Sequence, residues 1–285
     1  MSLVSIVIIS FNHERFIRSA IESVLFQNYK NIELIVVDNG STDNSIEIIK
    51  EYKNVRLVFN PQNGISKAIN IALSLASGEF FVPFASDDVM VFDRISCQVA
   101  LLASKGGGYM GCFGDMLCID QDGYLHKKGL IVTDARDNWS FSEVFTKRIK
   151  LFSPTQMYRT QDVKELGGFD EDCKIEDMAF YFKALSNGKK FLSTNKVLTF
   201  YRIHGTSTHT KIGYMLTNKL YILEKYKGHK LYKKAEYLAY LEAFSAAGSY
   251  DKLLAMRLFG RVFNQLGSKY LYFGLIRLLI DWRYV

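Results

Sequence analysis

The chain has 285 residues and a formal net charge of +7, with 48% hydrophobic and 23% charged residues. This is the composition of an ordinary folded protein, and the scarcity of proline (3 residues) excludes a long stiff linker. No apolar run is long enough to span a bilayer and no basic leader precedes the first strand-like segment, so we expect a cytoplasmic protein. The four cysteines form no CxxC pair, which indicates free thiols.

The hydrophobic pattern predicts alternating strands and helices in the N-terminal part. Short apolar runs bounded by polar residues are typical of buried strands, and apolar residues at three- and four-residue spacing are typical of helices. In chain order the pattern predicts strand 4–10, helix 14–25, strand 32–38, a helix that ends at 52, strand 55–59, helix 65–76 and strand 80–84. This alternation predicts an α/β fold with a doubly wound, mostly parallel sheet.

Two of the predicted strands end in carboxylates. Asp38 follows the second strand, and Asp87 and Asp88 follow the fourth. Open α/β sheets bind ligands at the carboxyl ends of their strands, so we expect these acids at a ligand site. The adjacent pair suits a divalent cation that carries a diphosphate, although a solvated helix cap is an equal alternative on the residues alone. No P-loop is present, and the first turn lacks the GxGxxG fingerprint of a dinucleotide site.

Several short motifs closely resemble the inverting glycosyltransferase family 2. They are Ser10-Phe11-Asn12, the run 33–43, Asn63-Gly64-Ile65 and Ser86-Asp87-Asp88, and the resemblance covers roughly residues 3–208. It implies a GT-A fold, a nucleotide diphospho-sugar donor, by default a UDP-sugar, and Mg²⁺ or Mn²⁺. The nucleotide-binding residues that it implies are Ser10, Phe11, Asn12, Asp38, Asn63, Gly64, Lys67 and Asp87.

The chain departs from the family pattern at one position. Many members have Asp-x-Asp-Asp where this chain has Ala85-Ser86-Asp87-Asp88, so the first acid is missing. Either Asp87 or Asp88 is expected to ligate the metal, while the other contacts ribose or a basic partner. The resemblance also suggests a flexible loop after residue 198, with His204 as a third metal ligand and Arg202 near the diphosphate. A lone histidine is, however, more often structural.

Glu176 and Asp177 precede a predicted helix at 178–185. They are either first-turn acids that favour the helix dipole or part of the catalytic machinery. The resemblance places this helix over the sugar site, so we expect Asp177 to be the general base and Glu176 to orient the acceptor or a loop.

The sequence pattern changes near residue 210. We expect a catalytic domain over 1–210 and a helical C-terminal region over 211–285, with helices at 214–226, 232–247, 251–266 and 269–285. From Gly205 onward thirteen Lys and Arg stand against five acids, so the tail carries the positive charge. These basic amphipathic helices either lie on an anionic membrane surface or pack on the catalytic domain or a second subunit. No nucleic-acid-binding motif accompanies the charge.

Together these features predict an inverting, metal-dependent glycosyltransferase of polysaccharide biosynthesis. Its acceptor is expected to be a glycan or a lipid-linked saccharide, and its location the cytoplasm or the inner face of the membrane. One alternative is a non-catalytic protein that binds nucleotide sugars or acts as a scaffold on the same fold. A sugar nucleotidyltransferase fits less well, because the turn after the first strand lacks a glycine-rich, basic loop.

Overall fold

The computed structural model describes residues 1–134, 137–147, 151–205, 211–263 and 269–280. The chain divides into two compact units, which are considered separately. The first consists of Met1–Phe141 and Ile149–Gly205, and the second of Ser142–Arg148 and Thr206–Val285. The end of the expected catalytic domain, at residue 210, falls in 206–210, outside the described residues.

The N-terminal half of the first unit is a parallel sheet with connecting helices. Strands β1 (Val4–Ser10), β2 (Ile32–Asp38), β3 (Val55–Phe59) and β4 (Phe80–Ala85) lie in the order β3-β2-β1-β4, and all of these pairs are parallel. Helices α1 (Ile17–Leu25), α2 (Ser45–Lys50) and α3 (Ile65–Leu75) connect them. The predicted alternation of strands and helices is confirmed, as is the mostly parallel α/β fold.

The other half of the sheet contains one reversal. Strand β8 (Met157–Arg159) runs antiparallel to both β4 and β6 (Gly111–Ile119), and β6 pairs in parallel with β9 (Phe191–Arg202). Strands β6 and β9 therefore point in the same direction as β4, and their carboxyl ends reach the same edge. The edge strands β5 (Val89–Met90) and β7 (Leu125–Ile131) pair antiparallel with β9 and β6. The predicted loop from residue 198 begins later than expected, because strand β9 continues to Arg202 and, of the described residues from 198 to 205, only 203–205 lie outside it.

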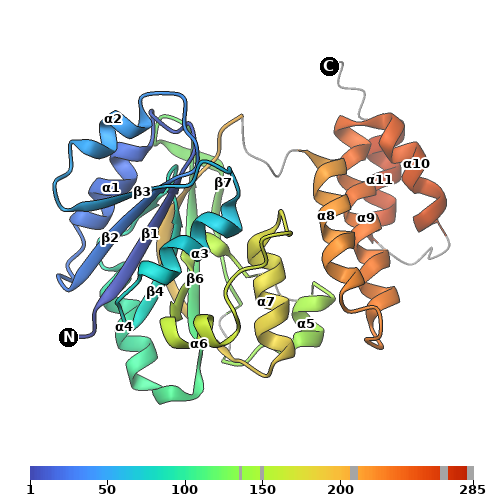
Figure 1. The fold of residues 1–285 in the computed structure, drawn as a ribbon. Helices are drawn as coiled ribbons and strands as arrows, with labels where there is room; N and C mark the ends of the chain where they lie inside the picture. The colour runs from blue at the N-terminus through green and yellow to red at the C-terminus, as the bar shows by residue number, and fades with distance from the viewer. Residues whose placement is uncertain (135–136, 148–150, 206–210, 264–268, 281–285) are drawn as a thin grey trace. The chain divides into compact units, whose positions relative to one another are not determined.

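The core lies between the sheet and the helices on its two faces (Figure 1). Alternate residues of β1 and β4, such as Ile6 and Val82, are buried against α1 and α4 (Arg94–Ser104). Helix α3 packs on the opposite face of β1 and β2. The remaining helices of this unit are the short α6 (Thr160–Glu165), α7 (Glu176–Ser186) and the 3-10 turns Gly106–Gly108 and Ser153–Thr155.

The fully buried Arg94 joins several segments of the first unit. The Arg94 guanidinium donates hydrogen bonds to the carbonyls of Pro154 (2.7 Å) and Gln156 (3.0 Å) and to Thr199 Oγ1 (2.8 Å), and its Nε donates to Gln98 Oε1 (3.1 Å). Burial lowers the pKa of Arg94 to about 9. These bonds tie α4 to β9 and to the turn before β8.

The second unit is helical. Its main elements are α8 (Ile212–Glu224), α9 (Tyr232–Tyr250), α10 (Lys252–Val262) and α11 (Lys269–Ile280), and α9 contacts each of the others. Phe145, the last residue of α5 (Phe141–Phe145), packs edge-on against Tyr226 and His229. A Cβ at Gly274 would collide with the Phe244 ring, so this glycine allows α11 to lie close against α9. Among the described helices, none has both the length and the apolarity required to cross a bilayer.

Candidate functional site

Asp38 lies at the carboxyl edge of the sheet with half of its carboxylate unpaired. It is the last residue of β2, in register with Ser10 of β1, and only 2% exposed. Its Oδ2 accepts hydrogen bonds from the backbone N–H groups of Gly40 (3.1 Å) and Ser41 (3.0 Å), whereas Oδ1 is buried without a partner. A buried acceptor without a donor is costly, so this oxygen is suited to receive a hydrogen bond from a ligand.

Other residues of the predicted nucleotide site lie in loops linked to this edge. Asn12 and Asn63 both adopt positive φ (52° and 44°), a conformation that asparagine tolerates better than most residues. Asn12 Oδ1 accepts from the Thr42 N–H (2.8 Å), and Asn39 Oδ1 accepts from the Gly64 N–H (3.1 Å). The loops after β1, β2 and β3 are thereby held together.

Three further residues of that prediction lie in different environments. Ser10 is buried and its hydroxyl has no partner, whereas the neighbouring Phe11 is 41% exposed. The Lys67 ammonium, on α3, donates to Gln62.

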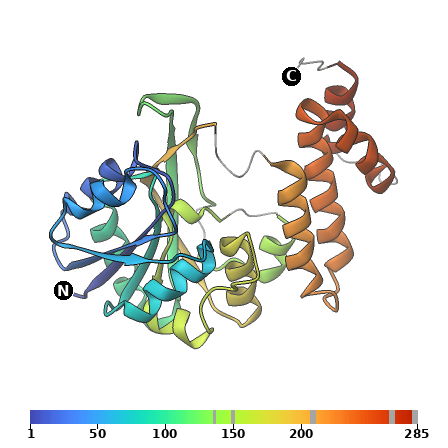
Figure 2. The ribbon, with the colours of Figure 1, turned by 45° about the horizontal axis from the view of Figure 1, so that its top comes forward.

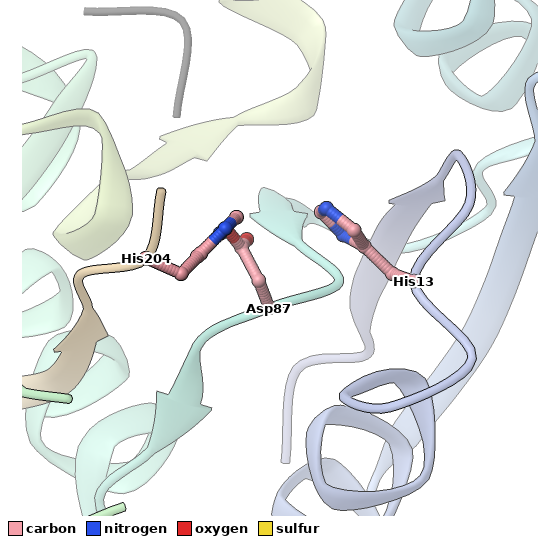
Figure 3. A group of neighbouring side chains, drawn as sticks. All are labelled: His13, Asp87 and His204. Carbon is pink, nitrogen blue, oxygen red and sulfur yellow. The ribbon is translucent and has the colours of Figure 1, made fainter. Parts of the chain in front are cut away.

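Three potential metal ligands converge at the same edge (Figure 3). One ligand atom each from His13, Asp87 and His204 lies within 4.8 Å of the other two. His204 Nε2 is 2.9 Å from Asp87 Oδ2, and His13 Nδ1 is 2.7 Å from the Ser86 hydroxyl. We call these three residues the ligand group.

The electrostatics of the ligand group keep its carboxylate ionised. Burial would raise the pKa of Asp87, but the hydrogen bond from His204 and the nearby His13 lower it overall. Burial lowers the pKa of His13, which favours the neutral imidazole that binds metal ions.

His13 is a residue that the sequence analysis missed. It comes three positions after the end of β1, so the strand-end argument that selected Asp38 could also have selected it.

Asp88 is not part of the ligand group. Its side chain is buried, its Oδ1 accepts a hydrogen bond from the Arg202 backbone N–H (2.8 Å), and its Oδ2 has no partner. Burial and the adjacent Asp87 raise its pKa well above the usual range. Of the two acids, Asp87 is therefore the one placed to ligate an ion.

The Arg202 side chain connects two loops at the edge. Its Nε donates to the Asp87 carbonyl (2.8 Å), and its Nη1 donates to the carbonyls of Asp120 and Gln121 (both 3.1 Å). The guanidinium also lies over the Phe16 ring, 5.1 Å from its centroid. These contacts hold the backbone of Asp87, and the phosphate contact of Arg202 stays a prediction.

Glu176 and Asp177 form the first turn of α7. Burial and the charge of Asp177 raise the pKa of Glu176 to about 8, so the pair holds a proton near neutral pH. Burial also raises the pKa of Tyr201, and the charges of Asp88, Asp87 and Asp177 act on it in the same direction. Tyr201 therefore lies within electrostatic reach of Asp177 as well as of the two acids that follow β4.

Solved structures show that the first unit has the GT-A fold. The structure of S. aureus TarS 1-349 in complex with UDP-GlcNAc has a TM-score of 0.64 at 17% identity, covering 97% of this chain and 88% of that one. A mannosyltransferase from Pyrobaculum calidifontis, in complex with GDP-Man and Mn²⁺, has a TM-score of 0.61 at 18% identity, covering 99% and 88%. At these identities the likeness shows the fold alone.

The chain belongs to glycosyl transferase family 2, whose model matches residues 5–159. A similar curated protein is the Escherichia coli UDP-Glc:alpha-D-GlcNAc-diphosphoundecaprenol beta-1,3-glucosyltransferase WfaP, 31% identical over 73% of this chain and 80% of its own length. Pasteurella multocida chondroitin synthase is also 31% identical over 73% of this chain, but over only 21% of its own length. The protein is thus a glycosyltransferase, and the resemblance seen in its sequence is confirmed. Glu176, Asp177, Arg202 and His204 lie beyond the matched residues.

Proposed function

We propose that this glycosyltransferase transfers a sugar, with inversion, from a UDP-sugar to a hydroxyl group of a glycan or lipid-linked saccharide in polysaccharide biosynthesis. The observation that carries the proposal is the position of the ligand group at the sheet edge that also bears the unpaired oxygen of Asp38. In this proposal Asp38 recognises the nucleobase, and the ligand group holds the diphosphate through a metal ion. The names of two similar proteins support the donor class, since WfaP uses UDP-Glc and TarS was solved with UDP-GlcNAc.

Asp38 is the proposed base-reading residue. Its free Oδ1 accepts the N3–H of uracil, while Oδ2 stays on the backbone of the Gly40–Ser41 turn. The loops that contain Asn12 and Asn63, together with Ser10, Phe11, Gly64 and Lys67, surround the nucleotide in this proposal. Because cytosine offers an acceptor at N3, the same geometry disfavours it.

The chemistry of the ligand group fits a divalent ion. Two imidazoles and one carboxylate suit Mn²⁺ better than Mg²⁺, which prefers oxygen ligands and bound water. A hydrogen bond between His13 Nδ1 and the Ser86 hydroxyl fixes the ring, so Nε2 would be the nitrogen that holds the ion. When bound, the ion neutralises the charge that develops on the departing diphosphate.

Asp177 is the proposed general base. It takes the proton of the acceptor hydroxyl as the oxygen bonds to the anomeric carbon and the bond to the diphosphate breaks. Glu176, with its pKa raised to about 8, keeps its proton at neutral pH and donates a hydrogen bond to the acceptor. Two adjacent carboxyl groups with separated pKa values thus perform different tasks.

Donor hydrolysis tests this function directly. The purified protein is incubated with UDP-, GDP- or dTDP-sugars and Mn²⁺ or Mg²⁺, and release of the nucleoside diphosphate is measured for the wild type, Asp177→Asn and the exposed control Glu47→Gln. We expect Mn²⁺-dependent release of UDP that a chelator abolishes, that Asp177→Asn strongly reduces and that Glu47→Gln retains. No release from any donor, together with metal-dependent UDP binding, would instead favour the non-catalytic binding protein.

A further inference from the structure

One face of α10 combines exposed apolar side chains with arginines. Leu253, Met256 and Phe263 are 60%, 65% and 47% exposed, and their helical spacing places them on one stripe together with Gly260. The buried residues of α10 (Ala255, Leu258 and Val262) lie on the opposite side. Arg257 and Arg261, also exposed, flank the stripe on one side. We call this surface the α10 face.

The segment that contains this face has no acidic residue. From Lys252 to Ile280 the chain has five Lys and Arg and neither Asp nor Glu. Helix α11 contacts α10 and lies beside it in Figures 1 and 2. It exposes a second set of apolar side chains: Tyr272, Phe273, Ile276 and Leu279. Exposed apolar groups gathered in this way mark an interaction surface, and the charge selects an anionic partner.

We infer that the α10 face docks on the surface of a bilayer that contains anionic lipids. Helix α10 has 11 residues, a length of about 16 Å, which is too short to cross a bilayer. A helix of this kind lies in the interface, with its apolar stripe in the boundary between headgroups and acyl chains. Arg257 and Arg261 at the side of the stripe then reach lipid phosphates, to which guanidinium groups bind with two hydrogen bonds.

A second copy of the chain fits this face less well. In a twofold-symmetric dimer in which the two copies of α10 pack antiparallel, the arginine pairs of the two subunits would lie on the same side of the interface and repel each other. No acid in 252–280 is available to separate them. An anionic lipid surface satisfies the same arginines without that repulsion.

Docking on lipid would also place the proposed reaction at the membrane surface. Only this consequence rests on the proposed function; the lipid binding itself does not. A lipid-linked saccharide presents its hydroxyl groups at the membrane surface. A catalytic unit held there meets the acceptor in two dimensions, which raises the effective acceptor concentration.

Vesicle flotation of the full-length protein tests the inference. The probes are phosphatidylcholine vesicles with and without phosphatidylglycerol, and the variants are Met256→Asp and the double variant Arg257→Gln/Arg261→Gln. Phe26→Asp, at a 70% exposed position of the other unit, is the matched control. We expect the wild type to bind only to vesicles with phosphatidylglycerol. The affinity for these vesicles should be about thirtyfold weaker in the double variant and more than about tenfold weaker in Met256→Asp. Phe26→Asp should bind them as the wild type does.

Three results would overturn it. They are no binding of the wild type to anionic vesicles, equal binding of the wild type and both α10 variants, or a dimer in light scattering that Met256→Asp dissociates without any vesicle binding. Donor hydrolysis measured on the same preparations separates the two proposals. Vesicle binding without hydrolysis would reject the proposed function alone, and hydrolysis without vesicle binding would reject the lipid surface alone.

Discussion

His204 Nε2 lies 2.9 Å from Asp87 Oδ2 although 117 positions separate the two residues in the sequence. The parallel direction of β4 and β9 produces this contact, because both residues follow the carboxyl end of a strand at the same edge. The bond orients both side chains toward His13 and lowers the pKa of Asp87.

Asp87→Asn and Asp88→Asn separate the two adjacent acids. Asp87→Asn removes the anionic ligand, so we expect the affinity of the nucleotide-free protein for Mn²⁺ to fall more than about a hundredfold. Asp88→Asn keeps an oxygen for the Arg202 N–H and should change this affinity less than about tenfold. Isothermal titration calorimetry measures both constants, and an equal loss in the two variants would contradict the assignment.

Asp38→Asn tests recognition of the base. The amide oxygen can retain the N–H groups of Gly40 and Ser41, which leaves the amide NH₂ facing the uracil N3–H, donor against donor. We expect UDP to bind about ten- to a hundredfold more weakly and CDP, whose N3 accepts a hydrogen bond from the new NH₂, to bind more tightly. Titration of both nucleotides gives the UDP-to-CDP ratio, and a ratio equal to that of the wild type would refute the role of Asp38.

Asp177→Asn and Glu176→Gln distinguish the base from its neighbour. Loss of a general base should lower kcat for transfer by about 10² to 10⁴, with UDP affinity retained. Glu176→Gln preserves a hydrogen-bond donor and should lower kcat less than about tenfold, mainly with a higher KM for the acceptor. Steady-state transfer assays measure both, and the reverse order of effects would exchange the two roles.

Glu176 should also make stability depend on pH. Its pKa is about 8 in the folded protein against 4.5 for the unperturbed group, so between these values the folded state binds a proton that the unfolded state has released. The contribution is fully present below pH 4.5 and is lost as the pH rises through 8, by at most about 5 kcal/mol of unfolding free energy. Glu176→Gln should remove this dependence of the unfolding free energy on pH. Urea unfolding of the wild type and the variant at pH 5 and pH 8 measures it. An unchanged slope would indicate that the pKa of Glu176 is not raised.

Arg94→Ala should destabilise the first unit far more than Arg18→Ala. Arg94 is fully buried, and its removal leaves the carbonyls of Pro154 and Gln156 without donors, at a cost of about 3 to 5 kcal/mol. The salt bridge between Arg18 and Glu51 is exposed, so its loss should have little effect. Thermal unfolding of both variants compares them, and a similar shift in Tm would be inconsistent with a structural role for Arg94.

The first half of the sheet was predictable because its signals are local. Each of β1, β2 and β3 is a short apolar run, and the predicted bounds 4–10, 32–38 and 55–59 match the structure. Asp38 was selected for the same reason, since it ends such a run.

The second half depends on pairings between distant segments. Strand β8 has only three residues and lies antiparallel between β4 and β6. The local hydrophobic pattern does not indicate this direction. Without that reversal the direction of β9 is unknown, so neither the end of the strand at Arg202 nor the convergence of His13, Asp87 and His204 follows from the sequence.

The late position of β9 in the chain fixes when the site can form during synthesis. Before this strand leaves the ribosome, Asp87 lacks the hydrogen bond to His204 and Asp88 lacks the bond from the Arg202 N–H. An ion that uses the ligand group therefore binds the finished sheet and does not template it. A nascent chain that stops before residue 191 holds most of the apolar core of the sheet but lacks one of the three members of the ligand group, His204.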